Sequence, residues 1–472
     1  MSSIRRSGTY VFRCNYLDLA SAFFVLHTVG VFGILSRLYY GESQDGSATT
    51  TALAAALNLG FVLACLALFL GRFRTTMSIS TGNLLAISLV LLFLLSIAWS
   101  VDPWTTSRRG GLYVFFVLGV IGMAARLTDR EFTGLMSTVC LLSAVASLAL
   151  LAFDPSSALA LPDSFGSFVA PAEVPLALRG IFIHKNVLGQ VMAAGVLANM
   201  HILRAAASRQ ARFWSVVRSI VFLVVVLASK SSTSISVTLY LCPMTFFICL
   251  YRRGGLTRVL GTSVAVLSGA IALALTLFPD PVLEILGKDA TLTGRTELWA
   301  LVVDKIYERP IAGWGYFAFW GSANPVANAI SAQLGWGGAV PTAHNALLEM
   351  LVEVGVIGTI LISVIFLRSV WLAYRCLRTS ARELGTSSLL CSSAIVIIGV
   401  TEPVLIDFSS PWTMLFFVFW LMCERTMRAV RRQNYLTQRR LGRSQAHDPA
   451  AVLARQSSRR NSTGADVQRL KP

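Results

Sequence analysis

The sequence is dominated by apolar runs of about the length, roughly 20 residues, that an α-helix needs to cross a bilayer. The 472-residue chain contains twelve such runs, and each is predicted to be a membrane-spanning helix. They lie at about 17–38, 51–70, 83–99, 111–126, 134–153, 181–203, 214–229, 233–251, 259–278, 346–374, 387–402 and 410–426. The runs at 214–229 and 233–251 can also be interpreted as one broken segment. This pattern predicts an all-α, polytopic membrane helix bundle.

The composition excludes an ordinary soluble enzyme. Hydrophobic residues make up 55% of the chain and charged residues only 13%, about half the charge content of a typical soluble domain. So few charges cannot cover the surface of a soluble body of this size. The eight cysteines lie in or beside apolar runs without metal-ligand spacing or a disulfide framework, and we interpret them as small buried apolar side chains.

Loop charges predict one orientation in the membrane. The formal net charge is +17, and Arg5, Arg6 and Arg13 precede a first apolar run that is longer than a signal-peptide core, so we interpret that run as an uncleaved span. With the N-terminus inside, the arginine-rich loops fall on the cytoplasmic side and the acidic loops outside, as the positive-inside rule requires. Both termini are therefore predicted to be cytoplasmic. We expect the basic charge to face anionic lipid headgroups and not nucleic acid.

The chain is predicted to divide into a bundle, residues 1–426, and a tail, residues 427–472. The bundle includes two outer loops, at about 154–180 and 279–345, and the second is longer than a connector needs to be, which is typical of a functional loop. Within it, residues 293–309 have the apolar spacing of an amphipathic helix. The tail is basic and poor in apolar residues, so it is predicted to be disordered.

A first group of polar residues lies at the outer start of the sixth run, in the segment RGIFIHKN. It contains Arg179, His184, Lys185 and Asn186. Charge at the edge of a membrane span is costly and needs a reason. Snorkelling to headgroups would explain the two cations, but it does not explain His184 and Asn186.

A second group precedes and begins the run at 346–374. His344 and Asn345 are followed by Glu349 and Glu353, and the last three share one helix face because they are four residues apart. Carboxylates on a membrane helix are expected to face the bundle interior and find partners there. Structural pairing with cations is the alternative to a role in a site.

Further candidates lie in the outer loops. Arg295 stands at the start of the predicted loop helix, where backbone N–H groups favour an anion, and Lys230 lies in the segment SKSSTS. Either could also be an ordinary surface cation. Trp314 belongs to the aromatic run GWGYFAFWG, and aromatic rings in this position stack on sugars or form an interfacial belt.

Together these residues favour glycosyl transfer from a lipid-linked diphosphate. The chain has no P-loop, GxGxxG, HExxH or GxSxG motif, and a polyprenyl diphosphate donor needs no nucleotide. Such a reaction needs a base for the acceptor hydroxyl, for which His344 is the candidate and a glutamate the substitute. The cations that would hold the diphosphate are Arg179, Lys185, Lys230 and Arg295.

Four segments resemble the O-antigen ligase and polymerase superfamily, and most of all its succinoglycan-type exopolysaccharide polymerases. They are RGIFIHKNVLGQ (179–190), TLTGRTELW (291–299), PIAGWGYFAFW (310–320) and PTAHNALLEMLVEVGVIG (341–358). The resemblance extends in order over about residues 95–420. It implies a glycosyltransferase of the C type in the bacterial inner membrane, which joins repeat units carried on undecaprenyl diphosphate at the periplasmic face without metal, nucleotide or other cofactor.

The resemblance also implies roles for individual residues. Arg179 and Arg295 match arginines expected to bind the diphosphate, and His344 matches the base or acceptor-positioning histidine. Lys230 departs from the family, whose Ser-rich motif often has arginine there. The remaining predicted substrate-binding residues are His184, Lys185, Asn186, Asn345, Glu349 and Trp314. The expected partners are the lipid-linked oligosaccharide, membrane lipids, and other polysaccharide export and chain-length proteins.

Three alternatives remain open at the sequence level. An O-antigen ligase would use the same donor and pass the glycan to lipid A core. A transporter or flippase would place charges near the bilayer midplane in repeated halves, whereas here the polar groups lie at one face. A structural subunit of an export complex would tolerate substitution of the predicted site residues.

The predicted topology can be tested directly. A periplasm-sensing reporter enzyme fused after residue 320 is expected to be active, because that position lies in an outer loop, and one fused after residue 255 is expected to be inactive. The opposite pattern would mean that the bundle is inverted.

Overall fold

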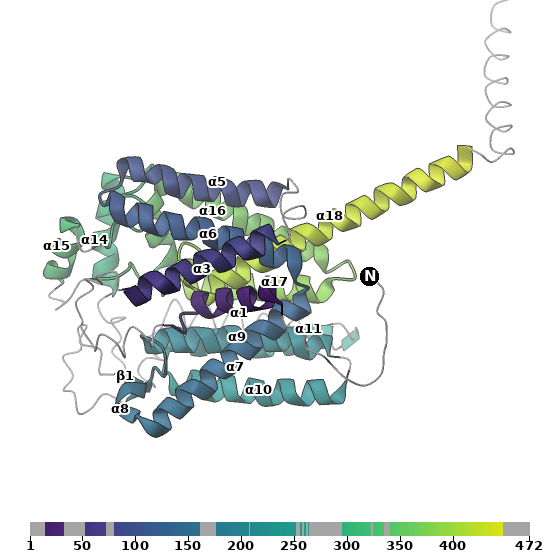
Figure 1. Cartoon of the computed structure of the whole chain (residues 1–472), viewed down its shortest axis with the longest axis horizontal. Coiled ribbons are helices and arrows are strands. Elements are labelled where there is room, and N and C mark those ends of the chain that lie inside the picture. Colours follow the sequence, from purple (N-terminus) through teal and green to yellow (C-terminus); the bar gives the residue numbers. More distant parts are fainter. Residues whose placement is uncertain are drawn as a thin grey trace, which may run out of the picture. The chain divides into compact units, whose positions relative to one another are not determined.

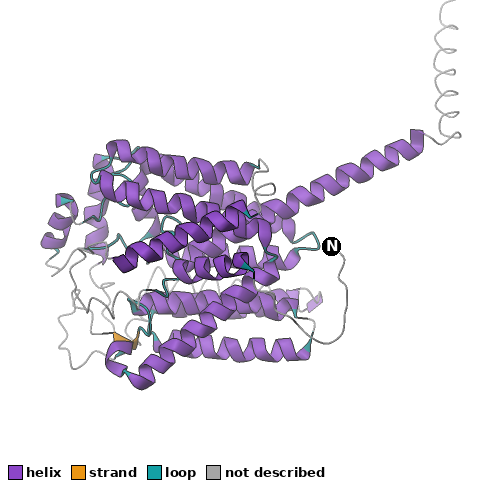
Figure 2. Cartoon of the chain, viewed as in Figure 1, coloured by secondary structure: helices purple, strands orange, loops and turns teal. Residues whose placement is uncertain are grey.

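The computed structural model of the protein describes residues 15–32, 52–71, 80–160, 176–206, 208–251, 255–256, 259–260, 263, 295–321, 324–334 and 340–446. The chain divides into two units, Met1–Cys423 and Glu424–Pro472. Helices make up most of the described residues, and Figure 2 marks only one short strand pair among them. The predicted fold class, an all-α membrane bundle, agrees with this architecture.

The helices of the first unit run side by side (Figure 1). They are α1 (Tyr16–Thr28), α3 (Ala52–Leu70), α5 (Thr81–Leu95) with the 3₁₀ turn η1 (Ser96–Trp99), α6 (Pro103–Arg126), α7 (Asp129–Phe153), α8 (Pro155–Ala158), α9 (Lys185–Ala205), α10 (Arg209–Ala228), α11 (Ser232–Tyr251), α14 (Arg295–Glu308), α15 (Pro325–Gln333), α16 (Ala346–Cys376), α17 (Arg382–Gly399) and α18 (Pro411–Ala446), which continues into the second unit. The strands β1 (Leu159–Ala160) and β2 (Ala177–Leu178) pair antiparallel.

Among the described helices, seven are long and apolar enough to cross a membrane: α3, α5 with η1, α6, α7, α9, α10 and α16. This supports a polytopic membrane protein. The number twelve stays a prediction, because the run at 259–278 lies almost wholly outside the described residues and α1 has only 13 residues. The runs at 214–229 and 233–251 form two helices, α10 and α11, separated by a turn.

Local sequence signals explain where several helices begin. Thr128 and Glu131 form a capping box at the start of α7, in which each side chain accepts the other residue's backbone N–H. Asp102 caps α6 by accepting from the N–H of Thr105, and Pro103 occupies its first turn. Because of that cap, α6 starts at Pro103, eight residues before the predicted span at 111–126.

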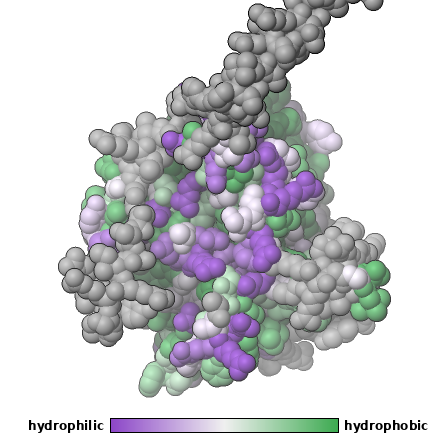
Figure 3. All heavy atoms as spheres, turned by 90° about the vertical axis from the view of Figure 1, so that its right-hand side faces the viewer, coloured by the Kyte–Doolittle hydropathy of each residue, from purple (hydrophilic) through white to green (hydrophobic). Residues whose placement is uncertain are grey.

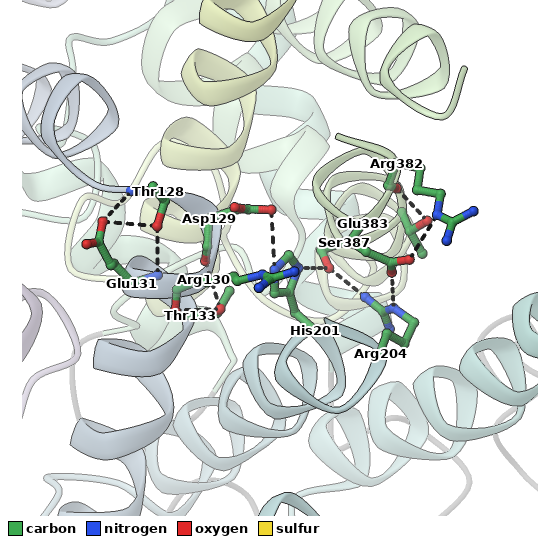
Figure 4. A network of polar contacts seen from close by, with 11 residues as sticks. Thr128, Asp129, Arg130, Glu131, Thr133, His201, Arg204, Arg382, Glu383 and Ser387 are labelled. Carbon is green, nitrogen blue, oxygen red and sulfur yellow. Dashed lines mark hydrogen bonds and ion pairs between the residues drawn. The ribbon is translucent and has the colours of Figure 1, made fainter. Parts of the chain in front are cut away.

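A buried polar network ties three helices together at one end of the bundle (Figure 4). Nε2 of His201 lies 3.4 Å from a carboxylate oxygen of Asp129 on α7, and its Nδ1 lies 2.9 Å from the hydroxyl of Ser387 on α17. Arg204 of α9 donates to the same hydroxyl at 2.6 Å and to Glu383 at 3.2 Å. Hydrophilic residues gather over this end of the molecule (Figure 3), as expected where helix ends meet water and headgroups.

At the opposite end, the helix α16 is broken at Gly355, whose φ of +63° takes it out of the helical region. Residues 310–315 of the outer loop supply hydrogen-bond partners to the backbone on both sides of the break. The carbonyls of residues 310–311 accept from the amides of residues 356–357 at 2.9 and 3.2 Å, and the amides of residues 314–315 donate to the carbonyls of residues 352–353 at 2.9 Å. Backbone groups that lose helical partners at membrane depth must be satisfied within the protein, and here residues 310–315 satisfy them.

The outer loop has a small apolar core of its own. The helix α14 lies within the predicted range 293–309, and its residues Leu298 and Val302 are buried against Trp314 and Phe319. Residues 293 and 294, at the start of the predicted range, lie outside the described residues. Burial of this apolar stripe gives the loop a fixed position beside α16.

The structure differs from the prediction for the first part of the tail. A disordered segment was predicted from residue 427, but α18 continues as a single helix to Ala446. The sequence from Glu424 to Ala446 contains neither proline nor a cluster of turn-forming residues, and arginine, alanine, leucine and methionine favour helix. Residues 447–472 lie outside the described residues.

We expect Gly355→Ala to destabilise the protein. A Cβ at this position would lie 2.3 Å from the carbonyl oxygen of Ile311 and 2.6 Å from the amide nitrogen of Ala312, which are backbone atoms that cannot move aside. The backbone of Gly355, with φ +63° and ψ −169°, lies in a region that is essentially restricted to glycine, which adds roughly 1–3 kcal/mol for any residue with a Cβ. The thermal midpoint of the purified protein should fall, whereas Gly134→Ala in α7, whose Cβ meets nothing within 4 Å, should leave it unchanged or higher. Equal midpoints would contradict the role of Gly355.

Candidate active site

Arg295 is the first residue of α14, and its side chain contacts the segment that follows α17. One guanidinium nitrogen donates to the carbonyl of Thr401 at 3.0 Å. The hydroxyl of Thr401 lies 2.7 Å from that of Thr233 on α11. Burial lowers the pKa of Arg295, and the carboxylate of Glu402 opposes that effect. Arg295 therefore connects α14 to the segment after α17, and Thr401 connects that segment to α11.

His344 lies in the segment that leads into α16 and has a left-handed backbone, with φ +49°. The next residue, Asn345, caps α16 by accepting from two backbone N–H groups of its first turn. The Nδ2 atom of Asn345 also donates to the carbonyl of Val400 at 3.3 Å. A left-handed conformation is uncommon outside glycine and often accompanies functional sites.

Glu402 connects two of the predicted site segments. Its Oε1 accepts from Nδ2 of Asn186 at 3.0 Å, and its Oε2 lies 3.9 Å from Nδ1 of His344. The side chain of Glu402 is 12% exposed and that of His344 is 25% exposed. The pair is thus largely withdrawn from water but is still open on one side.

Burial decides the charge of His344. It lowers the pKa of the imidazole to about 3, and the positive charge of Arg295 acts in the same direction. Burial also raises the pKa of Glu402, whereas Arg295 and His184 lower it. At 3.9 Å the carboxylate does not form a hydrogen bond with the ring, so the desolvation of His344 prevails. The imidazole is therefore neutral at physiological pH and can accept a proton.

The start of α9 lies beside this pair. His184 is the N-cap of α9, and its Nδ1 accepts from the backbone N–H of Asn186 at 3.2 Å. Lys185 is the first residue of the helix and is partly exposed. Asn186 projects to Glu402, as described above. The helix start thus contributes an amide, an imidazole and an ammonium group to one region.

Lys230 lies in the turn between α10 and α11, is exposed, and has a left-handed backbone with φ +50°. This turn packs against α9 at Gly189, where a Cβ would lie 2.6 Å from the hydroxyl of Ser234 and 2.9 Å from that of Ser229. The Ser-rich segment is therefore adjacent to the first turns of α9, on the same side as Asn186.

Arg179 is held by the short β-sheet. It follows β2, its Nε donates to the carbonyl of Ser157 at 3.2 Å, and its backbone N–H donates to Ala158. Five residues, 180–184, connect it to the start of α9. The contacts above join Arg295, His344 and Asn186 through residues 400–402. Arg179 adjoins this group along the chain.

Glu349 and Trp314 support the outer loop. A carboxylate oxygen of Glu349 accepts from the backbone N–H of Ala343 at 2.7 Å and from Nε1 of Trp320 at 3.1 Å. Trp314 is buried, donates through Nε1 to the carbonyl of Lys305 at 3.0 Å, and lies under the guanidinium of Arg309. The structure thus uses both side chains to hold the segment before His344. Glu353 behaves similarly, accepting from the N–H of Ala318 at 2.9 Å.

Glu402 is the residue that sequence reasoning left out of the site. It stands at the end of the apolar run at 387–402, where the following loop has two acidic residues, Glu402 and Asp407, and no basic one. This charge pattern indicates the side of the membrane on which the loop lies, but it does not indicate a site. A carboxylate directly after a membrane span, next to Thr401 and before Pro403, is the same kind of signal that pointed to His184 and Asn186.

Comparisons with known proteins agree with the resemblance seen in the sequence. Residues 218–363 match the O-antigen ligase family, Wzy_C, and this range includes Lys230, Arg295 and His344. The exopolysaccharide production protein ExoQ of Rhizobium meliloti strain 1021 is 29% identical over 189 residues. Over this middle part, the chain is similar to members of the O-antigen ligase and polymerase superfamily.

The matched part covers 38% of this chain and less than half, 43%, of the ExoQ protein. The family match ends before Glu402 and begins after Arg179 and Asn186. The similarity therefore concerns the middle of the chain, while the contacts described above extend to segments on either side of it.

The pKa of His344 predicts a pH-dependent stability. It is about 3 in the folded protein, below the ~6.5 of a free imidazole. Between these values the unfolded chain binds more protons, so stability must fall as pH falls from about 6.5 toward 3.

The variant His344→Asn keeps a residue that tolerates the left-handed backbone but removes this titration. Between pH 7 and pH 4 its thermal midpoint should fall less than that of the wild type, by roughly 2 °C or more, the shift that about 1 kcal/mol produces in a large domain. Other titrating groups affect both proteins equally. An identical loss in both would mean that His344 is not buried as described.

Proposed function

We propose that the protein is a polysaccharide polymerase that joins oligosaccharide repeat units carried on undecaprenyl diphosphate during exopolysaccharide synthesis. The observation that carries the proposal is the neutral, largely buried imidazole of His344, which lies beside Glu402 in a group of residues that also includes Arg295. A base and a cation together at one end of a membrane bundle suit a reaction whose donor is anchored in lipid.

In the proposed reaction a hydroxyl oxygen of the acceptor glycan attacks the anomeric carbon of the donor glycan. The bond from that carbon to the diphosphate oxygen breaks, and undecaprenyl diphosphate leaves with the electron pair. His344 takes the proton of the hydroxyl, as a general base with a neutral ring can do. The new glycosidic bond needs no nucleotide, because the diphosphate ester already supplies a good leaving group.

The cations are proposed to bind the diphosphate and to stabilise the negative charge that grows on it as it leaves. Arg295 and Arg179 would form paired N–H contacts with phosphate oxygens, and Lys185 and Lys230 would act as point charges. His184, Asn186 and Asn345 are proposed to bind the headgroup or its first sugar. Glu349 and Trp314 are proposed to act on the substrate through the outer loop that they hold.

The site is proposed to face the periplasm from the bacterial inner membrane, with both termini in the cytoplasm. The last turns of α6 and α9 each contain one arginine, Arg126 and Arg204, and the positive-inside rule would place such residues on the cytoplasmic side. We also propose that the reaction proceeds without a metal or nucleotide cofactor, and that export and chain-length proteins are partners.

An O-antigen ligase is the second candidate, because the family description names that activity and the donor side of the reaction would be the same. The name of the ExoQ relative refers to exopolysaccharide production, which favours the polymerase. A flippase is less well supported, since the polar contacts described here gather at the ends of the bundle.

Purified protein supplied with a defined undecaprenyl-diphosphate oligosaccharide tests the proposal. A polymerase should give a ladder of products that grow by whole repeat units, and adding lipid A core should not change it. Transfer of a single glycan to lipid A core, with no ladder, would identify a ligase. No transfer to either acceptor would overturn the proposal.

Two variants test the site in the same assay. Arg295→Ala and His344→Ala are expected to abolish polymer formation while the protein still accumulates in the membrane, since loss of one general base alone commonly costs roughly 10²–10⁴-fold in rate. Lys305→Ala, on the same helix and paired with Glu308, is the matched control and should retain activity. Normal polymer from both site variants would show that the catalytic assignment is wrong.

A further inference from the structure

Glu402 occupies a position to which neither the sequence motifs nor the family match assigns a role. Both of its carboxylate oxygens face residues of the candidate active site: Oε1 accepts from Asn186 at 3.0 Å, and Oε2 lies 3.9 Å from Nδ1 of His344. With only 12% of its side chain exposed, the carboxylate is largely removed from water. Such burial costs free energy unless partners compensate it, and both of these partners belong to the site.

The backbone on each side of His344 is anchored, which fixes the ring opposite Glu402. The preceding residue, Ala343, donates its N–H to Glu349 at 2.7 Å and accepts from Nε1 of Trp299 at 2.9 Å. The following residue, Asn345, donates to the carbonyl of Val400 at 3.3 Å. A left-handed backbone at a non-glycine residue persists only where its surroundings hold it, and these contacts do so.

The Nδ1 atom of His344 is buried and has no hydrogen-bond partner within the described part of the chain. Glu402 is an acceptor within reach of it. The 3.9 Å separation is longer than a hydrogen bond, but catalytic hydrogen bonds are often long in ligand-free sites and shorten when substrate binds. A shift of about 1 Å would bring this one to an ordinary N–H···O distance.

We propose that Glu402 is a positioning residue: Asn186 holds one carboxylate oxygen, and the other accepts a hydrogen bond from Nδ1–H of His344, which leaves Nε2 as the base. The proposal rests on the glycosyl transfer proposed above. When Nε2 takes the proton of the acceptor hydroxyl, the ring becomes an imidazolium, and the carboxylate stabilises that charge. The proton then passes from Nε2 to water, and the neutral ring is restored.

Another charged group acts on the pair. The positive charge of Arg295 opposes the effect of burial on the pKa of Glu402. The hydrogen bond of Arg295 goes to the carbonyl of Thr401, so the described contacts leave Oε2 of Glu402 directed to His344. This arrangement assigns Arg295 to the donor diphosphate and Glu402 to the base.

The first test is steady-state kinetics of the purified full chain with a defined undecaprenyl-diphosphate oligosaccharide. Glu402→Gln should lower kcat by at least about 100-fold and leave KM within about twofold, because an amide supplies no charge and does not fix the tautomer. Glu402→Asp should restore part of kcat. Asn186→Ala should lower kcat by a smaller factor, on the order of 10-fold.

Glu308→Gln, an exposed carboxylate of α14 outside the site, is the matched control and should match the wild type. Thermal midpoints of all variants separate positioning from folding, since Glu402→Gln should melt within a few degrees of the wild type. Retention of kcat within about threefold by Glu402→Gln, or a rise in KM with kcat unchanged, would overturn the proposal.

A second readout does not depend on the reaction. In ¹⁵N-histidine-labelled protein, NMR should show His344 with its proton on Nδ1, and Glu402→Gln should remove that preference; His344→Asn identifies the signal. A wild-type ring protonated on Nε2 would overturn the positioning role. If no lipid-linked glycan is transferred by the wild type, the proposed function fails, and the tautomer measurement still decides the role of Glu402.

Discussion

The structure depends on a single constraint, that backbone N–H and C=O groups inside a bilayer must find partners within the protein. Where α16 breaks at Gly355, four such groups receive their partners from residues 310–315 of the outer loop. That requirement draws the loop into the bundle. Because the same loop continues to His344 at its end, the hydrogen bonding of one helix also determines where the candidate base lies.

The glutamate carboxylates around this loop have two kinds of partner, backbone groups and side chains. Glu353 and Glu349 accept backbone N–H groups of residues 318 and 343, so they fasten the loop on the inside. Glu402 faces side chains instead, namely Asn186 and His344. Glutamates with similar burial therefore serve two purposes. Glu349 and Glu353 hold the backbone of the loop that leads to His344, and Glu402 faces the imidazole ring of His344.

The sequence predicted the features that follow from local pattern. Apolar runs located the helices, and capping residues such as Asp102 account for their starts. Polar residues at span ends identified His184 and His344 as candidates, and a cation at the start of the predicted loop helix identified Arg295. It could not predict that Glu402 faces Asn186, because these residues are 216 positions apart and no local periodicity encodes such a contact. The basic composition after residue 427 indicates disorder, whereas helix propensity favours the continuation of α18 to Ala446 that the structure has.

The hydrogen bonds between the outer loop and α16 limit which segments can be exchanged between related proteins. A loop grafted from another protein would bring its own spacing between the residues that meet α16, and a shift of one residue would leave membrane-depth amides and carbonyls without partners. Loop and helix must therefore be inherited together. Chimeric proteins that recombine this loop would need their junctions placed after Gly358, beyond the residues at which the loop and α16 are hydrogen-bonded.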